Sequence, residues 1–248
     1  MPLLNEADAI YLGATAVDKV YFGTNEVWPA ADYAAEVLAD SPVGYWRLEE
    51  TSGSTVADEI GTNDGTVYGA NLNVDGQVGS AASFDGIDDY ISIPYDAALN
   101  TATFTGEAII RADAFSSTLT RVLSFRKNAH NGWEMLVTDI GRLRLEWGDG
   151  SATRNAESPT NTILTETTYH VAVTHDGTTG RAYVNGTEVA FFDASLSVND
   201  TANMAIGNIL WTVAGQRGHT GMIDEVAVYD TALSAARILA HAQAAGLA

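Results

Sequence analysis

The sequence predicts an all-β protein: a β-sandwich with helices only at its margins and a small β appendage at its N-terminus. About a dozen short apolar segments are separated by turns rich in Gly, Asn and Asp. Several of these segments alternate apolar and polar residues, which is the pattern of a strand with one buried face. Hydrophobic residues make up 46% of the 248 residues, so the chain can fill a substantial core.

Composition excludes several classes of protein. The formal net charge is -20, from 12 Lys and Arg against 32 Asp and Glu, so the basic surface that nucleic-acid binding requires is missing. The acidic balance is compatible with cation binding and high solubility. No apolar run reaches membrane-spanning length and the N-terminus shows no signal-peptide pattern, so we expect no membrane insertion. Cysteine is absent, which excludes disulfides and thiolate sites.

Residues 1–30 form a segment of their own, and residues 31–248 form the main domain. Residues 10–17 are echoed by residues 20–27, with Tyr, Gly and Val recurring at a spacing of ten. Each half predicts a strand, a glycine-bearing turn and the start of a second strand. So small a β unit is marginally stable alone. Two interpretations remain: an extension that packs on the main domain or, as we favour, a docking segment for a larger partner.

The main domain begins after a short linker. Asp32 is placed to cap a helix that ends near Ala39, before a proline. Residues 43–50 are predicted as a strand that buries Trp46 in the core. The loop that follows, residues 58–65, is rich in oxygen ligands but lacks the spacing of an EF-hand.

The middle of the chain predicts a series of strands and hairpins. Residues 82–93 are expected to form a hairpin around an Asp-Gly turn, and residues 181–192 a second hairpin around an Asn-Gly turn. The polar stretch 149–162 is expected to be a loop. The remaining predicted strands are residues 65–68, 104–111, 119–125, 133–138, 142–147, 168–174 and 204–207.

The last strand contains a charge that needs an explanation. Residues 221–229 are apolar on both faces, as in an interior strand, yet Asp224 is predicted to share a face with Val226 and Val228. A carboxylate on an apolar face is costly unless something neutralises it. A C-terminal helix follows, with Ser234 as its N-cap and a glycine as its stop.

Four phrases, in order, resemble the laminin-G-like family of concanavalin A-like jelly rolls: "VGYWRLEETSG", "FDGIDDYISIP", "YHVAVTHDGTTGRAYVNGTEVA" and "GMIDEVAVYDTALSAARI". The resemblance spans residues 33–247 and implies a jelly-roll sandwich in which strand 221–229 is central. The sequence departs from the family at "TGEAIIRADAF", where relatives usually carry an aromatic after the Glu-Ala pair, and we expect Ile109 to fill that core position. The N-terminal phrase "IYLGATAVDKVYFGTNEVWP" resembles a short repeat found in bacteriophage virion proteins.

The family resemblance also implies a metal. In relatives the Asp of the closing strand often lies beside a bound calcium ion, so the resemblance implies that Asp58, Asn63 and Asp64 lie against Asp224 and hold a structural calcium with it. Calcium takes about six to eight oxygen ligands, which carboxylates and loop carbonyls supply. The alternative is a hydrogen-bonded Asp224 without a metal, and the sequence leaves both open.

No catalytic constellation is found in the sequence. Hydrolases that share this sandwich place Glu-x-Asp-x-x-Glu on one strand, and the nearest candidates here, Glu134 with Asp139 and Glu146 with Asp149, do not match that spacing. The five histidines are scattered, and we expect them in solvent or in turns rather than in a zinc site. The chain is therefore predicted not to be an enzyme.

Binding is the remaining class of function. The resemblance to jelly rolls implies a ligand site in the loops at one rim, where an exposed aromatic can stack on a sugar ring. Trp211, Arg217 and His219 lie in one polar loop and Trp133 follows another turn, so these four are the predicted glycan-binding residues.

The favoured hypothesis is a non-enzymatic bacteriophage virion protein: a fibre, decoration or tail-tip module located in the virion. Its residues 1–30 would dock onto other virion proteins, and its sandwich would present a lectin-like, glycan-binding surface. Homo-oligomers are compatible with this role, although no coiled-coil heptad predicts one. The alternatives are a virion module without a ligand, or a secreted carbohydrate-binding accessory module or weak glycan hydrolase.

Overall fold

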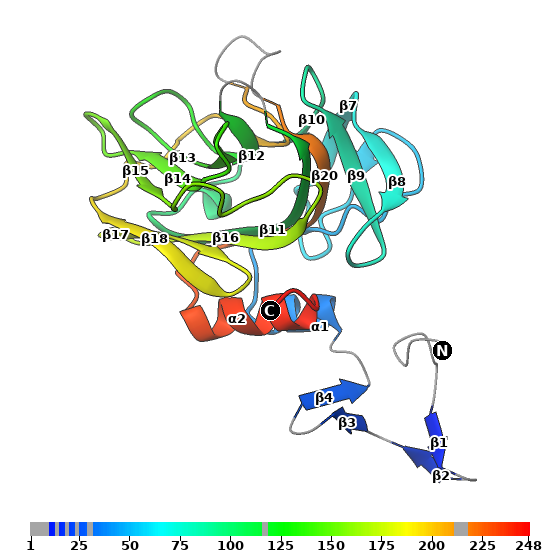
Figure 1. The fold of residues 1–248 in the computed structure, drawn as a ribbon. Coiled ribbons are helices and arrows are strands. Elements are labelled where there is room, and N and C mark those ends of the chain that lie inside the picture. The colour runs from blue at the N-terminus through cyan, green and yellow to red at the C-terminus, as the bar shows by residue number, and fades with distance from the viewer. Residues whose placement is uncertain are drawn as a thin grey trace.

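Two antiparallel β-sheets face one another, and a pair of helices covers the outside of one of them (Figure 1). The structure is a computed structural model that describes residues 10–12, 15–17, 20–22, 25–28, 32–115, 119–210 and 218–248. The first sheet has the strand order β15-β14-β13-β12-β19-β10-β7-β6, and the second has the order β18-β17-β16-β11-β20-β9-β8, with β5 paired to β20. The predicted β-sandwich is confirmed.

The bounds of the elements are as follows. The first sheet contains β6 (Thr55–Val56), β7 (Gly65–Tyr68), β10 (Tyr90–Ile93), β12 (Thr120–Ser124), β13 (Trp133–Val137), β14 (Leu143–Gly148), β15 (Thr153–Glu157) and β19 (Met204–Ile206). The second contains β5 (Gly44–Trp46), β8 (Asn71–Asp75), β9 (Ser80–Asp85), β11 (Thr103–Ala114), β16 (Thr168–Asp176), β17 (Thr179–Val184), β18 (Thr187–Asp193) and β20 (Thr220–Tyr229). The helices are α1 (Tyr33–Ala39) and α2 (Ala235–Ala244), with a short 3-10 turn at Ala97–Leu99.

The inner faces of the two sheets form one hydrophobic core. Trp46, Trp133 and Trp147 are all enclosed in it, as the sequence predicts for Trp46. Trp133 stacks between Phe104 and Phe125, with ring centroids 4.2 and 4.7 Å apart. Stacked aromatic pairs of this kind add to the stabilisation from buried area, so they fix the spacing of the two sheets.

Strand β20 lies between β11 and β9 and is buried along nearly its whole length, as predicted for an interior strand. A β-bulge interrupts its pairing with β11, and Glu225 takes a left-handed backbone conformation there with φ 51°. The extra residue shifts the alternation, so Ile223 and Val226 both belong to the sandwich core. The expectation that Asp224 shares a face with Val226 is therefore wrong, because simple alternation does not cross a bulge.

Two further expectations about the strands are corrected by the pairing. Residues 82–93 do not form a hairpin: β9 pairs with β8 and β20, whereas β10 pairs with β7 and β19, so the Asp-Gly turn carries the chain from one sheet to the other. The polar stretch 149–162 is not all loop, since it contains the edge strand β15. The predicted hairpin β17–β18 is confirmed, and the predicted strands β13 and β14 pair with one another.

Helices α1 and α2 lie side by side across the outside of the second sheet (Figure 1). Both predicted N-caps are confirmed, because the side chains of Asp32 and Ser234 accept hydrogen bonds from backbone N–H groups in the first turns. Arg237 of α2 joins the two helices by donating to Asp40 (2.7 Å) and to Glu36 (2.6 Å). Ile109, predicted to fill a core position, is buried beneath the pair.

The N-terminal segment forms two small sheets, β1 (Ile10–Leu12) with β2 (Thr15–Val17), and β3 (Val20–Phe22) with β4 (Asn25–Trp28). In the described part of the chain, these four strands pair only within the segment, and Figure 1 draws them beyond the helix pair. The predicted boundary at residue 30 stays a prediction. No helix among the described residues has the length and apolar content needed to cross a membrane.

Candidate functional site

The four predicted glycan-binding residues do not form a common surface. Trp211 and Arg217 lie outside the described residues. Trp133 is stacked in the sandwich core, and His219 is fully buried with its Nε2 3.2 Å from the carbonyl oxygens of both Arg111 and Met222. Burial lowers the pKa of His219 to about 4, so this ring is neutral at pH 7. The prediction is wrong for Trp133 and His219, because enclosed side chains cannot contact a sugar.

The predicted calcium ligands Asp58, Asn63 and Asp64 share one loop, in which Asp58 and Asp64 accept hydrogen bonds from backbone N–H groups of the loop and of β5. Asp58 accepts hydrogen bonds from the backbone N–H groups of Tyr45 (3.1 Å) and Asn63 (3.2 Å), one on each carboxylate oxygen. Asp64 accepts from the N–H of Asp58 at 3.0 Å. Both oxygens of Asp58 therefore cap backbone donors, which is typical of an Asx-type turn.

Asp224 binds a different segment. Its Oδ2 accepts from the N–H groups of Gln77 (3.0 Å) and Val78 (3.1 Å), while its Oδ1 is buried without a hydrogen-bond partner among the described residues. Burial raises the pKa of Asp224 to about 8, so the group is mainly protonated at pH 7. Asp58 and Asp224 share no hydrogen-bond partner among the described residues, and the calcium ion shared between them stays a prediction.

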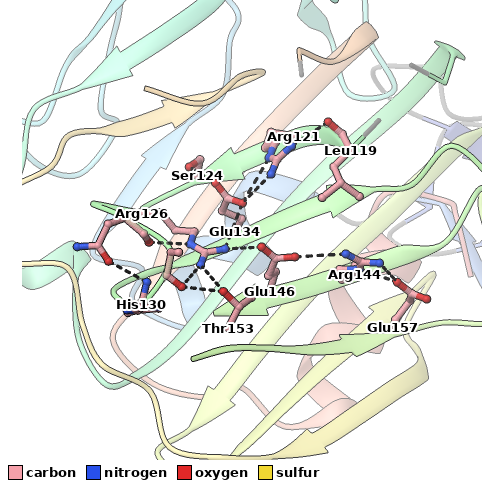
Figure 2. Close-up of polar contacts among 12 residues, drawn as sticks. Leu119, Arg121, Ser124, Arg126, His130, Glu134, Arg144, Glu146, Thr153 and Glu157 are labelled. Atoms are coloured by element: carbon pink, nitrogen blue, oxygen red, sulfur yellow. Dashed lines mark hydrogen bonds and ion pairs between the residues drawn. The ribbon is translucent and has the colours of Figure 1, made fainter. Parts of the chain in front are cut away.

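The outer face of the first sheet carries a ladder of alternating charges (Figure 2). Glu134 and Glu146 stand directly opposite one another on β13 and β14, with Arg126 bonded to Glu146 and 3.6 Å from Glu134. Arg121 binds Glu134 on one side, at 3.2 Å, and Arg144 binds Glu146 on the other, also at 3.2 Å. Like charges that lie opposite one another repel. The positive charges of the arginines offset the repulsion between Glu134 and Glu146.

This ladder bears on hydrolysis because it brings together two carboxylates that the sequence did not pair. A glycosidase needs two carboxyl groups that flank a bound sugar, one of them able to give up a proton. Here Glu134 is 0% exposed, and Arg126, itself 2% exposed, contacts both acids. A buried glutamate and a partly exposed one, bridged by an arginine, suit the support of a sheet better than general acid catalysis.

A groove lined by both polar and apolar residues opens on the outer face of the second sheet, where β16 to β18 pass the start of α2. Its volume is about 330 Å³. Arg181 donates to Asp176 at 2.7 Å and lies 3.7 Å from Glu188, and this ion pair holds the pKa of Asp176 well below its usual range. The groove is lined by Thr174, Asp176, Arg181, Tyr183, Glu188 and residues 232–235.

Phe191 does not line this groove, but it lies next to a residue that does, Arg181. It is the direct cross-strand partner of Arg181, and such partners project from the same face of a sheet. Its side chain is 64% exposed, more than any other large hydrophobic residue in the described part of the chain. The sequence placed it in a predicted strand but did not single it out. A flat aromatic ring beside hydrogen-bonding groups can contact both the apolar face and the hydroxyl groups of a sugar.

Solved structures share this fold at low sequence identity. The chain is similar to the binding domain of Paraclostridial Mosquitocidal Protein 1 (TM-score 0.68, 15% identity, 83% of this chain and 52% of that chain). It is also similar to domain 4 of an extracellular arabinanase from Geobacillus stearothermophilus, solved with arabinotriose (TM-score 0.63, 20% identity, 81% and 98%). A third neighbour is Trypanosoma rangeli sialidase with sialic acid (TM-score 0.61, 18% identity, 79% and 31%).

These neighbours differ in length and role. The chain covers about half of the mosquitocidal binding domain (52%) but nearly all of the arabinanase domain (98%). No curated protein matches the chain in sequence. A family model described as Concanavalin A-like lectin/glucanases superfamily matches residues 85–239, which is more than half of the chain. The chain belongs to the concanavalin A-like lectin/glucanases superfamily.

Proposed function

We propose that this chain is a non-enzymatic glycan-binding module and that the sugar binds in the groove beside Phe191. The observation that carries the proposal is the cross-strand pairing of a 64% exposed aromatic ring with Arg181, an arginine that lines an open groove of mixed polar and apolar character. Sugars need both kinds of contact, because a pyranose or furanose ring has an apolar face and a rim of hydroxyl groups. The lectin-like fold and the neighbour solved with arabinotriose support this class of ligand.

A panel of neutral and acidic oligosaccharides, measured by array and then by calorimetry, tests the proposal. For any sugar that binds, Phe191→Ala should weaken the affinity about tenfold, since the stacking contact is worth about 1.5 kcal/mol. The matched control is Ile87→Ala, which removes another exposed apolar side chain (59%) from a turn between the sheets. If the Phe191→Ala variant bound the sugar as tightly as the wild type, the sugar site would not be at Phe191. If no sugar bound the wild-type protein, the proposed function would be contradicted.

Hydrolysis is the competing activity. Incubation of the same sugars with the protein, followed by a reducing-end assay, is expected to show no turnover, because Arg126 bridges Glu134 and Glu146 and Glu134 is fully buried. Turnover that disappears in Glu134→Gln would instead support the weak glycan hydrolase considered above.

The biological setting proposed for this module is a bacteriophage virion. Residues 1–30 would dock onto other virion proteins, and the sandwich, alone or as a homo-oligomer, would face outward. Support comes from the repeated sequence and from the two small sheets β1–β2 and β3–β4, which pair only within the segment in the described part of the chain. Such small sheets gain stability when a larger partner covers them. A secreted accessory module is the alternative setting.

A fusion of residues 1–30 to an unrelated carrier tests the docking role. The carrier should be retained on purified phage particles that contain this chain, and a fusion with the same residues in scrambled order should not. Equal recovery of both fusions would contradict the role of the repeat.

A further inference from the structure

Four of the five histidines are fully buried, at 0% exposure, which corrects the expectation that they lie in solvent or in turns. His175 and His219 bind backbone carbonyl groups through their ring nitrogens. His170 and His241 differ, because both point a ring nitrogen at the same buried carboxylate, that of Glu107.

The three side chains come from three elements. Glu107 lies on β11, His170 on the neighbouring strand β16, and His241 on α2. His170 Nε2 is 3.0 Å from one carboxylate oxygen of Glu107, and His241 Nδ1 is 3.0 Å from both oxygens. The ligand atoms of the three residues lie within 4.8 Å of one another. Two imidazole nitrogens and one carboxylate therefore converge on one point between the helix pair and the second sheet.

The groups around the cluster are those that support a bound cation. The second nitrogen of His241, Nε2, lies 3.0 Å from Asp40 at the end of α1, and metal-ligating histidines commonly have a carboxylate in this position. Tyr229 donates its hydroxyl proton to Glu107 at 2.6 Å and so orients the carboxylate. His241 lies between the carboxylates of Glu107 and Asp40, and Arg237 already pairs with Asp40 at 2.7 Å. The buried carboxylate of Glu107 is the one that a protonated histidine or a bound cation must balance.

The Tyr33 hydroxyl is a second observation at the same place. It is fully buried, and it has no hydrogen-bond partner among the described residues. Its ring lies 6.4 Å from that of His170 and 6.5 Å from that of His241. Buried polar groups are nearly always paired, so an unpaired hydroxyl on a ring that packs edge-on against both histidines is compatible with a further polar group in this part of the core.

We propose that Glu107, His170 and His241 bind one zinc ion, which pins the helix pair to the second sheet. Zinc favours nitrogen and carboxylate ligands in tetrahedral sites, and bonds of about 2.1 Å place neighbouring ligand atoms roughly 3.4 Å apart. Each histidine nitrogen is 3.0 Å from a Glu107 oxygen, and all the ligand atoms lie within 4.8 Å of one another, so a small adjustment reaches that value. The site shares no residue with the lining of the proposed sugar groove, so the two proposals do not depend on one another.

Tag-free protein stripped with a chelator and titrated with zinc chloride tests the site. We expect one zinc per chain, a raised melting temperature, and strong visible absorption bands of tetrahedral geometry when cobalt(II) replaces zinc. His170→Asn and Glu107→Gln should abolish the stoichiometric binding and the absorption bands. The matched control His175→Asn also removes a fully buried histidine but should leave both unchanged.

The wild-type protein alone can overturn the proposal, even if the variants fail to fold. Folded, stripped protein that takes up no zinc at micromolar concentration and shows no change in melting temperature would contradict it. Stoichiometric binding that persists in folded His170→Asn would contradict it as well, because zinc would then be held elsewhere.

Discussion

At the residue scale, burial determines the protonation state of Asp224. Its side chain is 0% exposed, and burial raises its pKa from 3.8 to about 8, helped by the neighbouring charge of Glu225 and opposed by the N–H groups of Gln77 and Val78. The sequence predicted that something must neutralise this acid. Burial favours the neutral acid, so a proton neutralises Asp224 at pH 7.

The raised pKa of Asp224 predicts a loss of stability with rising pH. Between pH 4 and pH 8 the folded protein holds a proton on Asp224 that the unfolded chain has released. The contribution of this proton to the free energy of unfolding is therefore full below pH 4, falls as pH rises, and is lost once pH has risen through the folded-state pKa of about 8. The slope is at most about 1.4 kcal/mol per pH unit. Asp224→Asn mimics the neutral acid and should remove this part of the slope.

Urea denaturation of both proteins at pH 5, 6.5 and 8 measures this effect as a difference. The variant should gain stability relative to the wild type as pH rises. The matched control is Asp58→Asn, whose carboxylate is hydrogen-bonded to backbone donors and should show no such gain. A difference between Asp224→Asn and the wild type that is constant with pH would refute the assignment of the proton to Asp224.

At the scale of elements, β12, β13 and β14 are joined by charges as well as by backbone hydrogen bonds. Arg126, Glu134 and Glu146 stand on the outer face of this sheet, yet Arg126 and Glu134 are enclosed there (Figure 2). Removing one partner of a buried ion pair leaves an uncompensated charge, which costs more than the pair itself contributes. The ladder is therefore expected to tolerate change poorly, although surface ion pairs in general contribute little.

Arg126→Leu should lower the free energy of unfolding by roughly 3 kcal/mol or more, because Glu134 and Glu146 then face one another across neighbouring strands. The control is Arg111→Leu, whose ion pair with Asp113 is exposed on both sides and should contribute about 0–1 kcal/mol. Chemical denaturation measures both. Equal losses in the two variants would show that the ladder is an ordinary surface network.

At the scale of the whole molecule, the sequence predicts those features of the fold that depend on residues close together in the chain. The β17–β18 hairpin, the interior strand β20 and both helix caps follow from turn residues, apolar periodicity and capping chemistry. Which sheet receives each strand does not follow, since β9 and β10 separate at a turn that reads as a hairpin. Partners distant in sequence decide such pairings.

The same reason explains why the sequence missed most of the site. Phe191 has the apolar character of a core residue, and only the position of β18 at the edge of the sheet leaves it exposed. His170 and His241 are 71 positions apart and are brought together by the packing of α2 on β16 and β11. The sequence did place Glu107 and His170 in predicted strands. It could not show that these two strands are neighbours, because their spacing along the chain does not determine strand order.

The central claim is that this sandwich binds sugar on the outer face of β16 to β18, and amide chemical-shift mapping of the 26.2 kDa chain tests it most directly. The protein is titrated with the oligosaccharide that binds best in the panel. We predict that the largest shift changes lie in residues 174–191 and 232–235, around the groove and Phe191. Shift changes centred instead on β12 to β15, or absent throughout at saturating sugar, would contradict the claim.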